Sequence, residues 1–368
     1  MKKVLFTATV DSHILHFHLP YLEYFKNNNY EVHVATNTDK PILYCDKKHK
    51  IDINRSPYSL KNVKAIFQLK KIINAEKYDI IHCHTPMGSV VTRFSSMKTR
   101  KKNKTRIIYT AHGFHFYKGA PLKNWLLFYP IEKLLANYTD DIITINKEDY
   151  ELAKEKFNTN VHYVHGVGLN KNKFDIVMKK SEKTRLKKSL GLKDTDFIIS
   201  YVARLDKNKN QKFLIDVMDK ILKKNKNIHL LFIGNDELNG YFLRIVKNKK
   251  LQDNILFLGY RSDIPKLLRI TDLAVSSSKR EGLPVNIMEA MYCKVPIVAL
   301  KNRGIDDLII GDNRRKLLVS NEEEMVEKID CLISNNIKTI DYSNINSYLI
   351  DNVLQEVQKI YDIENDLK

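Results

Sequence analysis

Two glutamates in the second half of the chain have types and spacing that suit binding of hydroxyl groups. Residues 276–291 read SSSKREGLPVNIMEAM, in which seven residues separate Glu281 from Glu289. Gly282 permits a tight turn, and Pro284 suits the first position of a helix. We predict that a helix begins there, with its free N–H groups forming an anion site and Glu289 more than a turn inside it. The two carboxylates would then not form a general acid/base pair but would accept hydrogen bonds from hydroxyls at two parts of one ligand; the alternative for Glu289 is a charge on the helix surface.

A basic pair follows another apolar run, FIISYVA (197–203). Arg204 comes directly after this run, and Lys209 lies five residues further on, at the expected start of a helix. An arginine fork and a lysine point charge are well placed to bind a diphosphate. The alternative is a solvated basic loop.

Short β-branched runs alternate with helical stretches along most of the sequence, and this alternation predicts parallel sheets built from βαβ units. The runs form two series: 3–10, 31–36, 79–84, 106–112 and 141–146, then 197–203, 229–234, 254–259, 273–278 and 296–300. We therefore predict an α/β protein of two Rossmann-like, doubly wound domains that face a central cleft. The expected division is 1–170, 171–345 and a C-terminal helix at 346–368 that packs back on the N-terminal domain.

Composition favours a globular protein of the cytoplasm. The 368 residues exceed one ordinary core, and 43% of them are hydrophobic. The four cysteines lack disulfide or metal spacing, and the N-terminus reads as a strand without a signal-peptide cleavage site. Residues 1–175 hold 28 basic and 16 acidic residues, a net +12 of the total +19. This surplus suggests an anionic partner, although general solubility explains it equally well.

Five motifs, in this order, resemble those of the retaining glycosyltransferases of family 4, which have the GT-B fold. They are Tyr109–Gly113 with His112, Arg204…Lys209, Phe232–Gly234, Phe257–Tyr260 and the E-x7-E motif Glu281…Glu289. The resemblance spans roughly residues 3–360 and is nearest to bacterial enzymes that build capsular, exopolysaccharide or lipid-linked glycans.

The resemblance implies a role for each matching residue. Arg204 and Lys209 would neutralise the donor diphosphate, Glu281 with the backbone at Gly282 and Leu283 would hold the transferred sugar and phosphate, and Glu289 would accept from the ribose. Gly234, Gly259, Tyr260 and Arg261 would border the nucleotide. His112 would touch the sugar near the reacting centre. The catalytic set would be His112, Glu281, Arg204 and Lys209, with no metal and no other cofactor.

The implied activity is transfer of a hexose or N-acetylhexosamine from a nucleotide diphosphate sugar, expected to be UDP-linked, to a polyprenyl-diphosphate-linked glycan. Two alternatives share the fold: a sugar-nucleotide epimerase, and an inactive binding partner of another transferase. Nucleic-acid binding is not expected, because no recognisable binding motif accompanies the charge.

Two departures from the family pattern concern the loops. Val10-Asp11-Ser12-His13 stands where paired glycines are common, so we expect an acceptor-side loop there instead of a phosphate loop. His165-Gly166-Val167-Gly168-Leu169-Asn170 replaces an Asn-Gly-Val-Asp sequence, and we interpret it as a hinge.

Three weaker patterns remain, and the first two have simple explanations. Eleven of the twelve histidines precede residue 166, but His82, His84, His112 and His115 lack the carboxylates or cysteines that usually complete a zinc site. Asp194-Thr195-Asp196 precedes a strand at its amino end, so we interpret it as a turn.

The last pattern concerns membranes. The basic run 98–106 and the apolar stretch 119–138 around Trp125 suit a protein that lies on an anionic membrane face. The alternative is a core helix behind a solvated loop.

Overall fold

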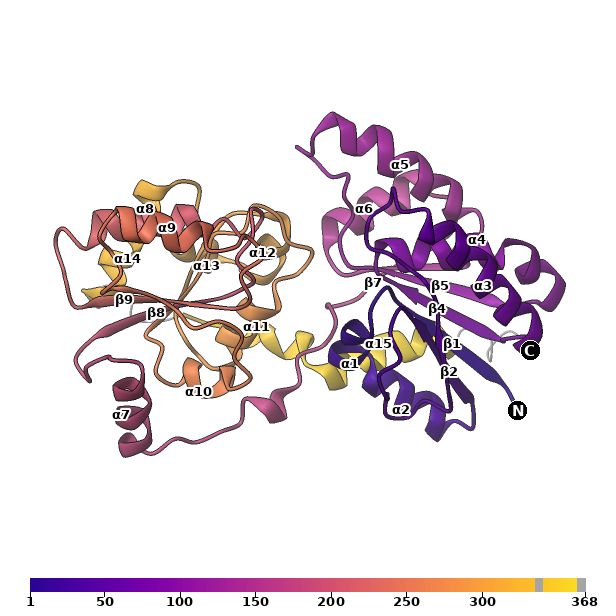
Figure 1. Ribbon diagram of the computed structural model, residues 1–368, viewed down its shortest axis with the longest axis horizontal. Helices are drawn as coiled ribbons and strands as arrows, with labels where there is room; N and C mark the ends of the chain where they lie inside the picture. The colour runs from indigo at the N-terminus through magenta and orange to yellow at the C-terminus, as the bar shows by residue number, and fades with distance from the viewer. Residues whose placement is uncertain (335–339, 363–368) are drawn as a thin grey trace. The chain divides into compact units, whose positions relative to one another are not determined.

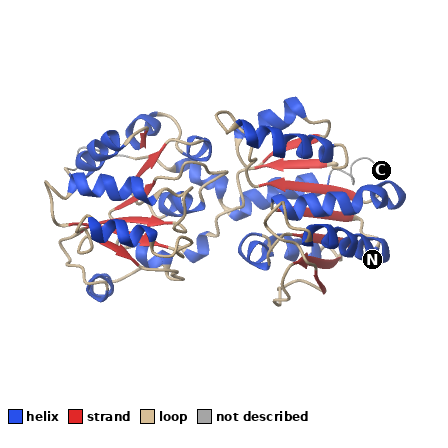
Figure 2. Cartoon of the chain, turned by 45° about the horizontal axis from the view of Figure 1, so that its top comes forward, coloured by secondary structure: helices blue, strands red, loops and turns tan. Residues whose placement is uncertain are grey.

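The chain divides into two α/β units, and the computed structural model describes residues 1–334 and 340–362 of them (Figure 1). The first unit holds Met1–Gly168 together with the segment that begins at Asp351, and the second unit holds Leu169–Ile350. Each unit has one parallel sheet with helices on both of its faces (Figure 2). The first unit is therefore built from two segments of chain that are separated by the whole of the second.

The sheet of the first unit has seven strands in the order β3-β2-β1-β4-β5-β6-β7, all parallel. The strand order reverses between β1 and β4, and this is the position at which ligands of doubly wound sheets bind. The strands are β1 (Lys3–Thr7), β2 (Glu31–Thr36), β3 (Lys47–Lys50), β4 (Ile80–His84), β5 (Arg106–Ala111), β6 (Asp141–Thr144) and β7 (Asn160–Tyr163).

The sheet of the second unit has six parallel strands in the order β10-β9-β8-β11-β12-β13. The same reversal lies between β8 and β11. The strands are β8 (Phe197–Val202), β9 (Ile228–Ile233), β10 (Ile255–Phe257), β11 (Leu273–Ser276), β12 (Ile297–Leu300) and β13 (Leu318–Val319).

All ten strands predicted from apolar runs are present, and the predicted two-domain α/β fold is confirmed. The three strands that were not predicted, β3, β7 and β13, all lie at sheet edges. The sequence of β3 is KKHK, which shows no apolar pattern because an edge strand is covered on fewer sides.

The helices of the first unit cover both faces of its sheet (Figure 1). Helices α3, α4 and α5 lie on one face, and α1, α2 and α15 lie on the other. Their bounds, with that of α6, are α1 (Asp11–Phe17), α2 (Leu19–Asn27), α3 (Lys61–Glu76), α4 (Pro86–Asn103), α5 (Leu122–Ala136), α6 (Lys147–Lys156) and α15 (Ile350–Asp362).

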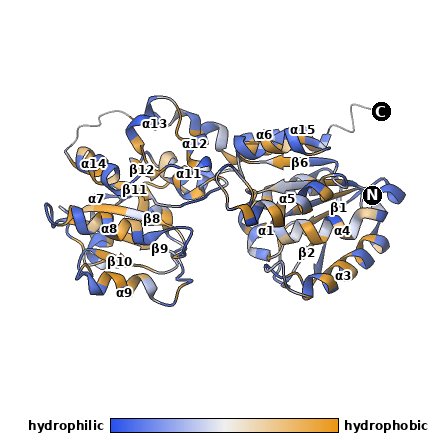
Figure 3. Ribbon diagram, turned by 90° about the horizontal axis from the view of Figure 1, so that it is seen from above, coloured by the Kyte–Doolittle hydropathy of each residue, from blue (hydrophilic) through white to orange (hydrophobic). Residues whose placement is uncertain are grey.

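In the second unit, α8, α9 and α14 bury apolar residues on one face of the sheet, and α10 does so on the other. Figure 3 shows apolar residues concentrated on the strands and on the helix faces turned toward them. The helices are α7 (Lys180–Ser189), α8 (Gln211–Ile221), α9 (Tyr241–Asn248), α10 (Ile264–Leu268), α11 (Val285–Tyr292), α12 (Arg303–Leu308), α13 (Asp312–Leu317) and α14 (Glu322–Ile333), with short 3-10 turns at Lys171–Lys173 and Ser343–Tyr348.

The C-terminal helix α15 is held on the first unit by buried polar contacts. Arg106 donates to the carbonyl oxygens of Ile360 (2.7 Å) and Tyr361 (3.0 Å), and it also pairs with Asp141. The Tyr361 hydroxyl lies 2.7 Å from a ring nitrogen of His82 on β4. An arginine side chain thus ties the backbone of α15 to strand β5 of the first unit.

Candidate active site

The loops that follow β8 and β11 carry the predicted diphosphate and sugar ligands of the second unit. Since β8 and β11 are neighbours and parallel, both loops emerge at the carboxyl edge of the sheet, beside the reversal of strand order. The Lys209 ammonium forms an ion pair with the Glu281 carboxylate between the two loops. Both side chains are largely buried, at 19% and 13% exposed.

Backbone contacts hold these two loops together. Asn208 donates its side-chain amide to the carbonyl of Arg280 (2.9 Å), and the N–H of Lys279 donates to the carbonyl of Asn208 (2.9 Å). The Asp206 carboxylate accepts from the N–H groups of Asn208 and Lys209, which sets the turn that presents Lys209. Lys209 and Glu281 therefore share one platform, which the two hydrogen-bonded loops form.

A buried group of hydroxyls holds the backbone of Lys209 in this platform. The Tyr201 hydroxyl donates to the carbonyl of Lys209 (3.0 Å) and lies 2.7 Å from the Ser278 hydroxyl, and Ser277 donates to the same carbonyl (2.8 Å). Ser277 and Ser278 have no exposed surface. Sequence reasoning missed this role, although a run of serines at the end of a buried strand is a usable signal because buried hydroxyls need partners.

The turn after Glu281 packs tightly on the start of α12. A Cβ atom placed on Gly304 would lie 2.7 Å from the carbonyl oxygen of Gly282 and 3.1 Å from Cβ of Glu281. Asn302 donates to the carbonyl of Ser278 (3.0 Å) and caps α12 by accepting from the N–H of Ile305. Gly304 and Asn302 thus position the E-x7-E turn, and neither was predicted.

Helix α11 begins one residue later than expected. Pro284 occupies the cap position, and Val285 is the first helical residue. Glu289 is the fifth helical residue and is partly buried. Burial raises its pKa to about 7, against an opposing effect of Lys173. Such a carboxyl changes charge near neutral pH, which is typical of functional sites.

The remaining predicted donor residues fall into two groups, of which the first is fixed by packing. Gly234 follows β9, and a Cβ there would lie 2.2 Å from the carbonyl oxygen of Ala203, so only glycine fits. Its N–H donates to the carbonyl of Gly259 (2.8 Å). Leu283 is buried, so only its backbone is available to a ligand.

The second group is more open. Arg204 is 55% exposed on its side chain, with weak ion pairs to Asp206 (3.5 Å) and Glu237 (3.9 Å). Tyr260 is 68% exposed. Arg261 forms a bidentate ion pair with Asp263 (2.7 Å for each hydrogen bond). This ion pair would have to break before the guanidinium could bind the base of a nucleotide.

His112 belongs to the first unit, where it directly follows β5 and is partly buried. Burial, and secondarily His82, lowers its pKa to about 4. Its Nε2 atom lies 3.0 Å from Nε2 of His13. A neutral ring at this edge can exchange a hydrogen bond with a substrate but carries no charge at pH 7.

The loop that replaces the family's paired glycines is built around Asp11. This buried carboxylate accepts from the hydroxyls of Thr36 and Thr38, from the N–H of Lys40 and from the Lys48 ammonium. Burial alone would raise the pKa of Asp11, but these hydrogen bonds outweigh it and lower the pKa to about 2. Asp11 is thus an internal anchor, and the acceptor-side role remains a prediction for the loop around it.

Two further sequence interpretations can be compared with the structure. The predicted turn at Asp194-Thr195-Asp196 is present at residues 194 and 195, and the N–H of Lys193 donates to the Asp196 carboxylate (2.7 Å).

Among the described helices, none combines the length and the apolar character needed to cross a bilayer.

Comparison with known proteins assigns the family. Residues 3–146 match the family described as Glycosyl transferase 4-like, and residues 182–348 match Glycosyl transferases group 1. EpsD of Bacillus subtilis, named a glycosyltransferase, is 41% identical over 334 residues, covering 90% of this chain and 87% of its own. The chain belongs to the family 4-like glycosyltransferases with the GT-B fold.

A more distant relative and a solved structure agree with this assignment. The UDP-Gal:alpha-D-GlcNAc-diphosphoundecaprenol alpha-1,3-galactosyltransferase of Escherichia coli is 25% identical over 316 residues, covering 84% of this chain and 80% of its own. The crystal structure of Anabaena HepE with UDP and glucose has a TM-score of 0.75 at 18% identity, with full coverage of both chains.

Proposed function

We propose that this glycosyltransferase moves a hexose or N-acetylhexosamine, with retention, from a UDP-sugar to a polyprenyl-diphosphate-linked glycan in surface polysaccharide synthesis. The observation that carries the proposal is the platform that joins Lys209 and Glu281 at the carboxyl edge of the second sheet. The E. coli relative supports the uridine donor and the lipid-linked acceptor by its name, and HepE supports UDP as the nucleotide.

The diphosphate would bind where positive charge and free N–H groups converge. Arg204 is exposed and only weakly paired, so its guanidinium is available to a phosphate at little cost. Lys209 would exchange part of its contact with Glu281 for the diphosphate, and the N-terminus of α11 adds backbone N–H groups. These groups would stabilise the leaving nucleotide as its charge develops, so we assign no metal to the transfer step.

The two glutamates would then bind the two sugars. Glu281, in the turn packed on Gly304, would hold the transferred sugar, and Glu289 would accept from the ribose hydroxyls. The departing phosphate would help to take the acceptor proton, so the chain needs no dedicated base for that step.

Thermal shift with UDP, GDP and ADP tests the donor site on the wild type, on Arg204→Ala and on Lys212→Ala. Lys212 is the control because its exposed side chain pairs with Asp216 (2.5 Å). We expect one diphosphate to raise the melting temperature of the wild type and of Lys212→Ala, but not that of Arg204→Ala. Absence of any shift would contradict the donor site and favour an inactive binding subunit, whereas donor consumption without acceptor would indicate an epimerase.

We further propose that the first unit lies on the cytoplasmic face of an anionic membrane through α3 and α5. Helix α5 exposes five apolar side chains at helical spacing, namely Leu122, Leu126, Leu127, Ile131 and Leu134. Helix α3 exposes Val63 and Phe67, and both helices pack against α4 on the same face of the sheet (Figure 1). Exposed lysines interleave them, as in interfacial helices.

Trp125, which suggested a membrane segment, lies on the core-facing side of α5 and not on its exposed side. Trp125 packs with Phe116 and Tyr129 and donates to the carbonyl of Tyr117 (3.3 Å), so it faces the core. The leucines on the opposite side of the same helix carry the proposal instead. One face of α5 is thus packed on the core, and the exposed leucines of the other face support the proposed membrane surface.

Co-sedimentation with vesicles of anionic phospholipid at low salt tests this surface. We expect Leu122→Glu/Leu126→Glu to reduce binding by about 100-fold or more, because two buried leucines contribute roughly 3 kcal/mol or more. Leu243→Glu, on an exposed position of α9, is the control. Equal binding of all three proteins, or binding to neutral vesicles only, would contradict the proposed surface.

A further inference from the structure

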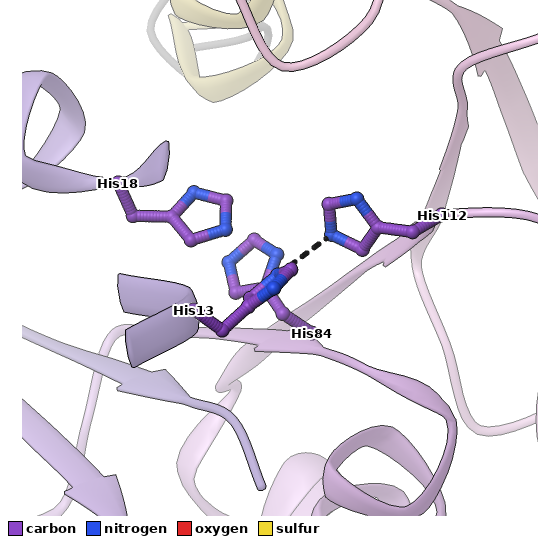
Figure 4. A group of neighbouring side chains, drawn as sticks. All are labelled: His13, His18, His84 and His112. Carbon is purple, nitrogen blue, oxygen red and sulfur yellow. Dashed lines mark hydrogen bonds between the residues drawn. The ribbon is translucent and has the colours of Figure 1, made fainter. Parts of the chain in front are cut away.

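Four histidines meet at the carboxyl edge of the seven-stranded sheet (Figure 4). His84 ends β4, His112 follows the adjacent strand β5, and His13 and His18 come from α1 and its C-terminal cap. One ring nitrogen of each lies within 4.8 Å of the corresponding nitrogens of the other three. Strand β4 and strand β1, which precedes α1, flank the reversal of strand order, where doubly wound sheets bind ligands.

The two inner rings have nitrogen atoms that the described residues leave without partners. Both nitrogens of His18 and both of His84 are buried without a hydrogen bond, and these residues are 3% and 0% exposed. Buried polar groups are normally paired, so such a group needs an explanation. His82, two residues before His84, follows the rule: its nitrogens contact Tyr361 (2.7 Å) and Thr110 (2.8 Å).

We propose that His13, His18, His84 and His112 bind one divalent transition-metal ion, with zinc as the first choice, through one ring nitrogen each. Imidazole nitrogens suit zinc, copper and nickel, whereas magnesium and calcium require oxygen ligands that this cluster lacks. The proposal does not depend on the transferase assignment, and it departs from the expectation of no metal, which weighed His84 and His112 without His13 and His18.

The spacing of the four rings allows them to bind one shared ion after small side-chain rotations. Tetrahedral zinc with bonds of about 2.0–2.1 Å places ligand nitrogens about 3.3–3.4 Å apart. The His13 and His112 nitrogens are already 3.0 Å apart. Ring centroids in the cluster are separated by 3.8 to 6.0 Å, which brackets the roughly 5 Å expected for imidazoles on one tetrahedral ion.

A second group of candidate ligands, His33, His49 and Glu76, provides a contrast. His33 contacts Tyr78 (2.8 Å) and Glu31 (2.8 Å), and Glu76 pairs with two lysines, Lys3 (2.9 Å) and Lys47 (2.6 Å). These ligand atoms are already engaged by protein groups. This group is therefore the matched control for the experiment.

The test uses the full chain without a polyhistidine tag, stripped with chelator and desalted. Zinc retained after dialysis is measured by elemental analysis, and cobalt is titrated while its visible absorption is recorded, since tetrahedral cobalt absorbs far more strongly than octahedral cobalt. We expect one equivalent of zinc and a tetrahedral cobalt spectrum for the wild type and for His49→Ala.

Substitutions of the two partly exposed ligands, His13 and His112, should disturb folding least. We expect His13→Ala and His112→Ala each to weaken zinc binding by about tenfold or more, with unchanged circular dichroism in the absence of metal. His84→Asn provides a buried variant with the same expected loss. The proposal is overturned if the wild type retains no zinc, if both single variants bind as tightly as the wild type, or if binding is lost in His49→Ala.

Discussion

Lys209 and Glu281 form an ion pair that joins the loops after β8 and β11 in the second unit. The pair is largely shielded from solvent, so each charge is compensated by the other when no ligand is present. A diphosphate that approaches Lys209 must therefore compete with Glu281 for the ammonium group. The two residues can be separated experimentally because they would act on different parts of the donor.

Lys209→Ala should weaken UDP binding by about 10- to 100-fold, since a hydrogen bond to a charged group contributes about 1.5–3 kcal/mol. Glu281→Gln should bind UDP at least as tightly as the wild type, because Lys209 is then unopposed, while sugar transfer falls by about 100-fold. Isothermal titration with UDP and a turnover assay separate the two effects. Equal loss of UDP affinity in both variants would argue that the ion pair only supports the loops.

Gly304→Ala should disturb the turn at Gly282, which packs against the start of α12. The new Cβ would lie 2.7 Å from the carbonyl oxygen of Gly282, which is too close for a backbone atom, so the turn must move away. Overpacking of this kind costs about 1–3 kcal/mol. We expect a lower melting temperature together with weaker UDP binding, both measured on one preparation. A variant with wild-type UDP affinity would show that the position of this turn is not critical for the donor.

Glu289 should make stability and donor binding depend on pH in opposite directions. Its pKa is raised from 4.5 to about 7, so the folded state holds a proton that the unfolded state has lost between these values. Stability therefore falls as pH rises through this window, by about 3 kcal/mol in total. Glu289→Gln removes this dependence, so it should become more stable relative to the wild type between pH 5 and about 8.

The charged form of Glu289 is the better acceptor for ribose hydroxyls, so UDP should bind the wild type more tightly as pH rises through about 7. In Glu289→Gln this increase should be absent. Titration of both proteins with UDP at several pH values provides the measurement, and parallel profiles would exclude Glu289 as the ribose ligand.

Arg106→Ala should loosen the C-terminal helix. The substitution removes two hydrogen bonds to α15 and leaves the buried Asp141 without its arginine partner, for which we expect a loss of about 3–5 kcal/mol. Arg100→Ala, which breaks the more exposed pair with Asp140, should cost about 1 kcal/mol or less. Urea unfolding monitored by tyrosine and tryptophan fluorescence compares them, and equal midpoints would contradict a special role for Arg106.

The sequence predicted the fold well because its central strands are buried on both faces. In β9, for example, Leu230 to Ile233 form a continuous apolar run that is buried throughout, as a covered strand requires. The edge strands β3 and β13 lack such a run, and their pairing depends on neighbours far away in the sequence. No local pattern could have indicated them.

The sequence also predicted that the proposed donor-site residues follow strand ends, but it did not indicate their partners. Arg204, Lys209 and Glu281 follow strand ends that are visible in the pattern, whereas the pairing of Lys209 with Glu281 spans 72 residues. Trp125 illustrates the same limit: α5 is apolar on two faces, and only the packed structure shows which face is covered. The four histidines of the proposed metal site lie between residues 13 and 112, so no local sequence pattern connected them.

The discontinuity of the first unit has a consequence for biosynthesis. Because the second unit, Leu169–Ile350, interrupts it, a ribosome delivers that whole unit before the residues of α15 emerge. Until then the guanidinium of Arg106 and the ring of His82 lack Ile360 and Tyr361, their partners on α15. The nascent chain therefore completes its later unit first, and the part of the earlier unit that α15 covers stays exposed until then, a period in which chaperones can bind it.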